Sequence, residues 1–206
     1  MKKILLIIIL FIALLNAENF TDFNKTHSVN IEALSVTKFE LTDMDFENPE
    51  IIDLGGKDFF VVSVRESGSD GRIYAVDRDG IIWWSGQISS GAGGGHETDN
   101  NIFHILSKKR FHMSSKYPST DGKNNMDFTI RFTADGQAIH LGNIEAMSYG
   151  CIHVAEDDIR PLYKWSKIGM PVVIMRGNYI QFLNQEIKEF EREIKEYDEK
   201  TQKINQ

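Results

Sequence analysis

Cys151, the one cysteine of this chain, and two nearby histidines are the residues whose types and spacing favour covalent chemistry. A cysteine becomes a nucleophile when its thiolate is stabilised, and a nearby imidazole can take the thiol proton. His140 precedes Cys151 by eleven residues, across a loop that contains Gly142, and His153 follows it by two. On a strand, His153 points to the same face as Cys151. The spacing therefore indicates a thiol nucleophile with a histidine base close by.

The backbone around Cys151 fits the same chemistry. Gly150 would let a substrate approach the main chain closely, and the N–H groups of residues 149 to 151 could hold a developing oxyanion. A structural interpretation stays open, because lone cysteines are often core residues and Cys151 lies between Gly150 and Ile152. A histidine in a strand, such as His140, is likewise often a hydrogen-bonded structural residue.

The first residues of the 206-residue chain predict export. Lys2 and Lys3 precede an unbroken apolar run of twelve residues, 4–15, and Ala17 offers a small residue for cleavage before Glu18. A spanning helix needs about 20 apolar residues, so the run is typical of a cleaved signal. We expect a signal peptide at 1–17, no integral membrane span after cleavage, and a periplasmic or exported bacterial protein. An exported chain with one cysteine forms no internal disulfide.

Charge and composition exclude several partners. The formal net charge is −7, and loss of Lys2 and Lys3 makes it −9. With no Lys/Arg cluster, we expect no nucleic-acid partner. His96, His104 and His112 are spaced by eight residues, which fits no usual short metal-ligand motif. We therefore predict neither a metal site nor a cofactor.

Four segments follow from the hydrophobic pattern: the signal 1–17, a polar leader 18–55, a domain 56–178 and a helix 179–206. The domain is predicted to be mostly β, a sandwich or barrel, because short apolar runs alternate with Gly-containing turns such as Asp79-Gly80 and Asp135-Gly136. A short helix is predicted at 157–165, after the cysteine. The expected strands cover residues 59–64, 72–76, 81–84, 102–106, 129–132, 137–140 and 171–175.

The last segment is predicted to be an amphipathic helix. Its apolar positions repeat at heptad spacing on a charged background, as in a coiled coil. An isolated helix would leave this seam exposed, so we expect it to dock on its own domain or to self-associate, with pairing to the leader as a third alternative. The seam consists of Ile180, Leu183, Ile187, Phe190, Ile194 and Tyr197.

The stretch from 125 to 174 resembles the catalytic domain of the L,D-transpeptidases. That family has a histidine at a strand end and then Ser/Thr-His-Gly-Cys, followed by an apolar residue and Arg or Asn. Here the corresponding residues are His140 and then Ser148-Tyr149-Gly150-Cys151-Ile152-His153. The resemblance spans roughly residues 57–176. Two positions depart from the pattern, because Tyr149 replaces the motif histidine and His153 replaces Arg or Asn.

The resemblance implies an exported enzyme that transfers acyl groups between peptidoglycan stem peptides. Cys151 would form the thioester and His140 would be the base, with the backbone near Gly150 and Cys151 stabilising the oxyanion. If water is the acceptor, the protein is an L,D-carboxypeptidase that trims tetrapeptide stems. The departures at Tyr149 and His153 also leave open a non-catalytic cell-wall-binding protein. A thiol oxidoreductase is poorly supported because the chain has no Cys-X-X-Cys.

Overall fold

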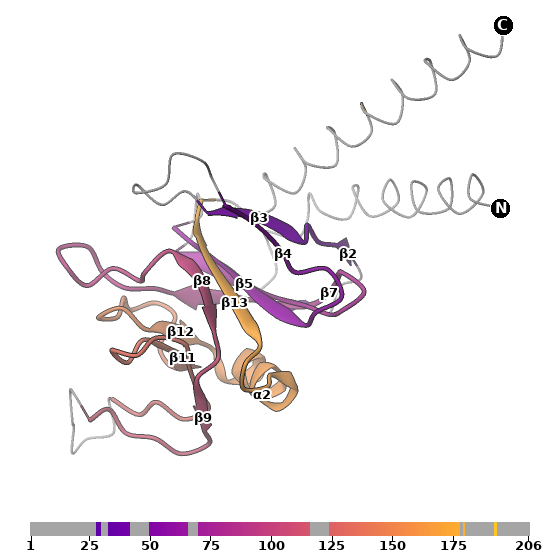
Figure 1. The fold of residues 1–206 in the computed structure, drawn as a ribbon. Coiled ribbons are helices and arrows are strands. Elements are labelled where there is room, and N and C mark those ends of the chain that lie inside the picture. Colours follow the sequence, from indigo (N-terminus) through magenta and orange to yellow (C-terminus); the bar gives the residue numbers. More distant parts are fainter. Residues whose placement is uncertain are drawn as a thin grey trace, which may run out of the picture.

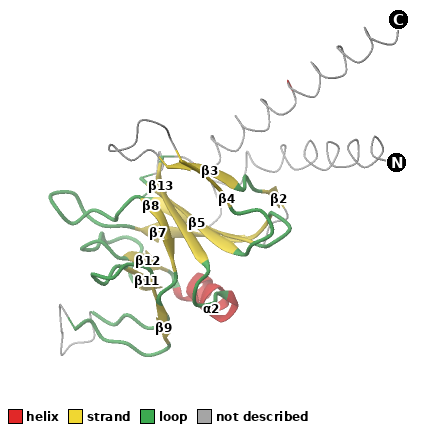
Figure 2. Cartoon of the chain, viewed as in Figure 1, coloured by secondary structure: helices red, strands yellow, loops and turns green. Residues whose placement is uncertain are grey.

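The computed structural model describes residues 28–29, 33–41, 50–65, 70–115 and 124–177, together with residues 179 and 192. The predicted signal at 1–17 and the apolar seam of the predicted C-terminal helix lie outside the described residues. Within them the chain is mostly β with one helix after the cysteine, as the sequence predicts (Figure 2). The described residues include no helix with the length and apolar character needed to cross a membrane.

The strands follow one another along the chain and the helix comes between the last two. Their bounds are β1 (Ser28–Val29), β2 (Ala33–Leu34), β3 (Lys38–Leu41), β4 (Glu50–Asp53), β5 (Phe59–Val64), β6 (Gly71–Val76), β7 (Ile81–Ser89), β8 (Asn101–His104), β9 (Ser107–Lys109), β10 (Thr129–Arg131), β11 (Ala138–Leu141), β12 (Ile152–Val154), α2 (Glu156–Trp165) and β13 (Pro171–Arg176).

One large sheet contains most of these strands, in the order β8-β13-β5-β6-β7-β12-β11-β10-β9, with β1 and β2 also pairing with β7. Helix α2 covers one side of it, and the separate β3–β4 hairpin lies toward the other (Figure 1). The central strands β5, β6 and β13 are apolar on both faces because both faces are covered. Along β5, Phe60 and Val62 belong to the core beneath α2, whereas Phe59 and Val61 belong to the core beneath the hairpin.

Helix α2 is fixed to the sheet by polar bonds as well as apolar contacts. Ile159 and Leu162 are buried in the core, and the buried Asp158 accepts a hydrogen bond of 3.0 Å from Trp84 Nε1. At the other end of the helix, Lys108 Nζ donates to the carbonyl of Tyr163, where a cation complements the negative end of the helix dipole. The helix therefore holds β7 and β9 in fixed positions relative to each other.

The segment 18–55 contributes structure in its described parts. Strands β1 and β2 pair with β7, and Phe39 of β3 is buried against Phe59 with ring centroids 5.8 Å apart. Tyr179, the first residue of the predicted C-terminal helix, is helical and fully buried, with its ring 4.9 Å from that of Tyr74 and its hydroxyl bonded to Ser35. The start of that segment thus packs on the domain, and the self-association of the rest stays a prediction.

The sheet places the cysteine segment through one parallel pairing. Strand β11 pairs with β12 so that Ile139 opposes Ile152 and His140 opposes His153. Ile139 and Ile152 both point into the core beneath α2. Because side chains alternate along a strand, the two histidines lie together on the other face.

Candidate active site

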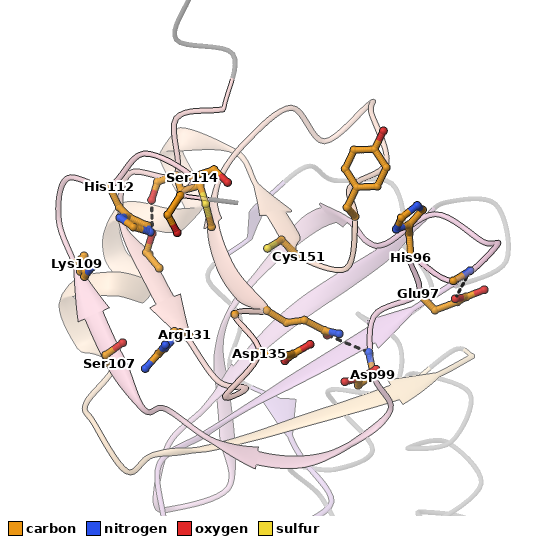
Figure 3. Close-up of a pocket in the computed structure, with 17 residues that line it drawn as sticks. His96, Glu97, Asp99, Ser107, Lys109, His112, Ser114, Arg131, Asp135 and Cys151 are labelled. Atoms are coloured by element: carbon orange, nitrogen blue, oxygen red, sulfur yellow. Dashed lines mark hydrogen bonds between the residues drawn. The ribbon is translucent and has the colours of Figure 1, made fainter. Parts of the chain in front are cut away.

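An open cavity of about 660 Å³ lies beside the cysteine segment. Cys151 and Tyr149 are on its lining, as are residues of the loop after β7 and of strands β9 and β10 (Figure 3). Cys151 is half-buried, so its thiol is within reach of a molecule in the cavity. Its lining residues are Gly95, His96, Glu97, Asp99, Ser107, Lys109, His112, Ser114, Ser115, Met126, Thr129, Arg131, Asp135, Gly136, Gln137, Tyr149 and Cys151.

Strand pairing brings His140 to the same side of the sheet as Cys151. Cys151 precedes His153 by two residues, and His153 opposes His140 across the β11–β12 pair. A two-residue step on an extended chain returns to the same face, so Cys151 is a diagonal neighbour of His140. Gly142 and the loop that follows thus connect the strand that carries His140 to the segment that carries Cys151.

His140 is not one of the residues that line the cavity, and it is 5% exposed. Its Nδ1 is 2.8 Å from the carbonyl oxygen of Leu141, and because a carbonyl only accepts, Nδ1 carries the proton and donates it. The neutral ring then has its lone pair on Nε2, the nitrogen able to take a proton. Burial lowers the pKa of His140 to about 4, with smaller contributions in the same direction from His153 and His112. At neutral pH the ring is therefore uncharged.

His153 has a different environment although its ring centroid is only 5.1 Å from that of His140. It is half-exposed, and its Nδ1 lies 3.0 Å from both the Asn143 and the Ala146 carbonyl oxygens. A side chain on Gly142 would clash with the His153 ring, because a Cβ there would lie 2.6 Å from Cγ and Cδ2. His153 is thus held by the loop 142–146, and Gly142 is required for the ring to pack on that loop.

The cysteine segment is held by side-chain bonds to its own backbone. Ser148 Oγ donates to the carbonyl of Cys151 and accepts the Gly150 N–H at 3.1 Å. Thr98 Oγ1 donates to the Gly150 carbonyl at 3.0 Å and accepts the N–H of Gly91 at 2.9 Å. The Gly150 N–H therefore already has a partner. This bond fixes the orientation of the Gly150 peptide within the cysteine segment.

Two glycines allow the cysteine segment and the loop after β7 to meet. Gly150 has φ of +107°, a conformation that other residues rarely adopt. A Cβ on Gly91 would lie 2.8 Å from the Gly150 Cα and 2.0 Å from the His96 carbonyl oxygen. The backbones at residues 91 and 150 are therefore in direct contact, which explains how Thr98 reaches the Gly150 carbonyl.

A second layer ties the same loop to the sheet. Arg65, which has φ of +62°, donates to the Gly91 carbonyl at 2.6 Å and forms an ion pair with Asp70 at 2.7 Å. Asp70 in turn accepts the N–H of Ser90. Arg65 and Asp70, neither of which lines the cavity, thus hold Ser90 and Gly91 in place.

Tyr149 lies at the cavity edge and is 63% exposed. Its ring contacts His96 edge-on, with centroids 4.5 Å apart. His96 comes from the loop after β7, where its neighbour Glu97 accepts hydrogen bonds from the Gly94 and Gly95 N–H groups at 3.0 Å. The backbone N–H of Glu97 itself, and after it those of Gly95 and Gly94, keep the pKa of the exposed Glu97 carboxyl below its usual value. The Tyr149–His96 contact thus closes one end of the cavity.

Sequence reasoning found the cysteine segment and missed the wall that faces it. Strand β9, with the sequence Ser-Lys-Lys, has no β-branched or aromatic residue and was not predicted. His96 and His112 were considered as metal ligands, whereas both line the cavity with Cys151. No role is predicted from the sequence for Thr98, which bonds the Gly150 carbonyl and the Gly91 N–H. Thr98 follows the Gly-rich loop 91–95, and a hydroxyl at such a position can bond the backbone of the loop. This pattern in the sequence could have indicated its role.

The comparison with protein families identifies the class of this chain. The family model for the L,D-transpeptidase catalytic domain (YkuD) matches residues 60–174. This is more than half of the chain, and it contains Cys151, His140 and all but the outermost residues of the unit from β5 to β13. The protein belongs to the L,D-transpeptidase catalytic domain family, as the resemblance of residues 57–176 predicts.

Solved structures show similar folds at low identity. An L,D-transpeptidase from Mycobacterium smegmatis is 16% identical with a TM-score of 0.48, over 69% of this chain and 69% of that one. One from Stackebrandtia nassauensis is 20% identical with a TM-score of 0.46, over 56% and 55%. L,D-transpeptidase 3 from Mycobacterium tuberculosis, in complex with a faropenem-derived adduct, is 20% identical with a TM-score of 0.46, over 69% of each chain. No curated protein sequence matches the chain. The family assignment rests on the sequence match.

Proposed function

We propose that this protein is an exported, cysteine-dependent acyl-transfer enzyme that acts on peptidoglycan stem peptides. The observation that carries the proposal is the shared face of Cys151 and His140 beside an open cavity, in a chain of the L,D-transpeptidase family. Cys151 supplies the nucleophile, and His140, neutral at pH 7 with its Nδ1 proton bonded to Leu141, supplies the base through Nε2.

The chemistry proceeds in two balanced steps. His140 takes the Cys151 thiol proton as the sulfur attacks the carbonyl carbon at the L-centre of meso-diaminopimelate, forming a C–S bond. The C–N bond to the terminal D-alanine then breaks, and the proton on His140 passes to the departing amine. An acceptor next attacks the thioester carbonyl, gives a proton to His140 and releases the Cys151 thiol. Backbone N–H groups near Gly150 and Cys151 are proposed to stabilise the oxyanion in both steps.

The acceptor decides between two activities that share this acyl-enzyme. If the acceptor is the side-chain amine of another stem, the product is a crosslink and the enzyme is an L,D-transpeptidase. If it is water, the enzyme is an L,D-carboxypeptidase that shortens tetrapeptide stems. The open form of the cavity and its many polar lining residues suit a second peptide as acceptor, and we favour the transpeptidase.

Mass spectrometry of purified muropeptides incubated with the mature protein tests the proposal. Release of D-alanine with formation of crosslinked dimers is expected, and tripeptide alone would indicate the carboxypeptidase. Cys151→Ala should abolish turnover while leaving thermal unfolding unchanged, because a half-buried thiol contributes little packing. Turnover by Cys151→Ala at the wild-type rate would refute the nucleophile.

A non-catalytic cell-wall-binding protein is the second candidate, suggested by the replacement of the motif histidine with Tyr149. Thiol reactivity separates the two functions, since a binding protein needs no activated cysteine. We expect intact-mass analysis to show acylation of Cys151 by a carbapenem, as the family resemblance suggests. A wild-type protein that binds peptidoglycan and remains unmodified, with no turnover, would instead establish the binding function.

A further inference from the structure

The cavity wall formed by β9 and β10 carries two cationic side chains. Thr129 opposes Lys109 across the two strands and Arg131 opposes Ser107, and all four residues line the cavity. Lys109 and Arg131 are thus diagonal neighbours on one face, about 7–8 Å apart at their Cα atoms. Between Ser107 and Lys109, Lys108 points the other way and donates to the Tyr163 carbonyl.

Neither of these cations has a carboxylate partner among the described residues. The Nε of Arg131 is removed from solvent and has no hydrogen-bond partner within the described part of the chain. Buried charged donors are normally paired, and leaving one unpaired is unfavourable. By contrast, Arg65 and Arg160, away from this wall, form ion pairs with Asp70 and Glu156. The Arg131 guanidinium is therefore suited to bind an anionic ligand.

A histidine lies in the same corner of the cavity. His112 lines the same cavity, and its pKa is lowered first by burial and then by the charge of Lys109. Lys109 itself is exposed and extends from the strand end. Figure 3 shows Lys109, Ser107 and Arg131 on one side of Cys151. A negatively charged group of a ligand bound near Cys151 would lie close to Lys109 and Arg131.

The charge of the cavity lining changes from positive to negative away from β9. Asp99 and Asp135 also line it, next to Gln137, whose Oε1 accepts the Asp99 N–H at 3.1 Å. In Figure 3, Asp135 and Asp99 are labelled on the opposite side of Arg131 from Lys109. Arg131, four residues before Asp135 in the chain, thus has Lys109 on one side and the carboxylates on the other, which matches a ligand group with an anion and a cation on one carbon.

We propose that Lys109 and Arg131 bind the carboxylate at the D-centre of the meso-diaminopimelate side chain, with Asp99 and Asp135 facing its ammonium. This inference rests on the proposed function. A tetrapeptide stem also has carboxylates on D-glutamate and on the terminal D-alanine, but the D-centre is where a carboxylate and an ammonium share one carbon. That carbon is joined through three methylene groups to the L-centre, whose carbonyl Cys151 attacks. Recognition by Lys109 and Arg131 would thereby position the reacting carbonyl.

The test measures binding in the Cys151→Ala background, where no turnover consumes the peptide. Calorimetry compares a synthetic tetrapeptide stem with two versions that are amidated at the D-centre carboxyl or at the D-glutamate α-carboxyl. Amidation at the D-centre should weaken binding about tenfold or more, as expected for the loss of a charged hydrogen bond. Arg131→Gln should bind all three peptides with similar, weakened affinity. Lys109→Gln should lose part of the discrimination.

Arg78→Gln is the matched control. Arg78 is exposed in the turn before β7, and the bond recorded there comes from its backbone N–H to Asp58. Its substitution should leave every affinity unchanged. Thermal unfolding of each variant checks the fold. If Arg131→Gln does not fold, Lys109→Gln still decides the question, because an exposed side chain at a strand end can be replaced without disturbing the core.

The outcomes separate this inference from the function on which it rests. If D-centre amidation has no effect, or if Arg131→Gln and Lys109→Gln both bind like the parent, the inference is wrong. It is also wrong if only D-glutamate amidation weakens binding. In either case turnover of stem peptides by the wild-type protein leaves the proposed function standing. If the wild type neither turns over nor binds any stem peptide, the proposed function itself fails.

Discussion

His140 and His153 oppose one another on neighbouring parallel strands, and their rings are 5.1 Å apart, yet they lie in different environments. The His140 ring is 5% exposed and bonded to the Leu141 carbonyl next to it in the chain. The His153 ring is half-exposed and bonded to a surface loop. Sequence spacing ranks the two as near equals beside Cys151, and burial distinguishes them.

Burial has two opposite consequences for His140 as a base. It keeps the ring neutral at pH 7, so that Nε2 has a lone pair ready for the thiol proton. It also makes the ring a weak base, because an imidazolium is costly to form in an apolar site. A thiolate formed beside it would offset that cost by charge pairing. Proton transfer from Cys151 to His140 would therefore be favoured because it produces a thiolate–imidazolium ion pair, in which neither charge is isolated.

The largest effect expected from this comparison is on acylation. His140→Ala should slow the formation of the acyl-enzyme by a factor on the order of 10² to 10⁴, the usual contribution of a general base. His153→Ala should have a smaller effect, because His153 is bonded to the loop 142–146. Single-turnover kinetics with a stem peptide measures both. A reversed ranking would make His153 the base and show that burial is a poor guide here.

The second effect concerns stability against pH. The folded pKa of His140, about 4, lies below its ordinary value of 6.5, so the unfolded chain binds the proton more readily in this range. The stabilisation from His140 is therefore fully present above pH 6.5 and is lost as pH falls toward 4. The loss amounts to about 3 kcal/mol.

Denaturant unfolding from pH 7 to pH 4 measures this loss. We expect the free energy of unfolding of the wild-type protein to fall more steeply with acid than that of His140→Gln, which has no ionisable group at this position. Arg78→Gln, an exposed position away from this site, serves as the control and should follow the wild-type curve. Parallel curves for the wild type and His140→Gln would mean that the imidazole is not the buried, neutral group described above.

The third effect tests the loop that holds His153. Gly142→Ala places a methyl group against the His153 ring, so the ring or the loop must move. Overpacking of this kind typically costs about 1–3 kcal/mol. Thermal unfolding should show the destabilisation, and acylation should be reduced far less than in His140→Ala. Gly136→Ala is a useful comparison, because its Cβ would meet open space although its φ of +114° also disfavours alanine.

The two histidines also show how far the sequence predicts this site. Apolar runs and turn residues predict most of the sheet, because strands such as β5 and β13 are apolar along most of their length. Such strands are buried whichever strands they pair with. The sequence also predicts the cysteine segment, which is local. It does not indicate which histidine is buried, because that depends on the parallel β11–β12 pairing. Lys109 and Arg131 meet only when β9 pairs with β10, and β9 has a strand sequence without β-forming residues.

The smallest effect concerns Tyr149, where the chain departs from its family. Its ring is 63% exposed and contacts His96 edge-on, so the aromatic surface has a structural partner. Tyr149→Phe keeps that contact and removes only the hydroxyl. If Tyr149 acts by packing on His96, the rate of acylation should change by less than a few-fold, whereas Tyr149→Ala should lower it more by opening the cavity edge. His96→Ala should reproduce the Tyr149→Ala effect, and the double variant should add little, because residues in contact do not contribute independently. A large loss in Tyr149→Phe alone would assign the hydroxyl a direct role in catalysis. It would then be the counterpart of the histidine that the family has at this position.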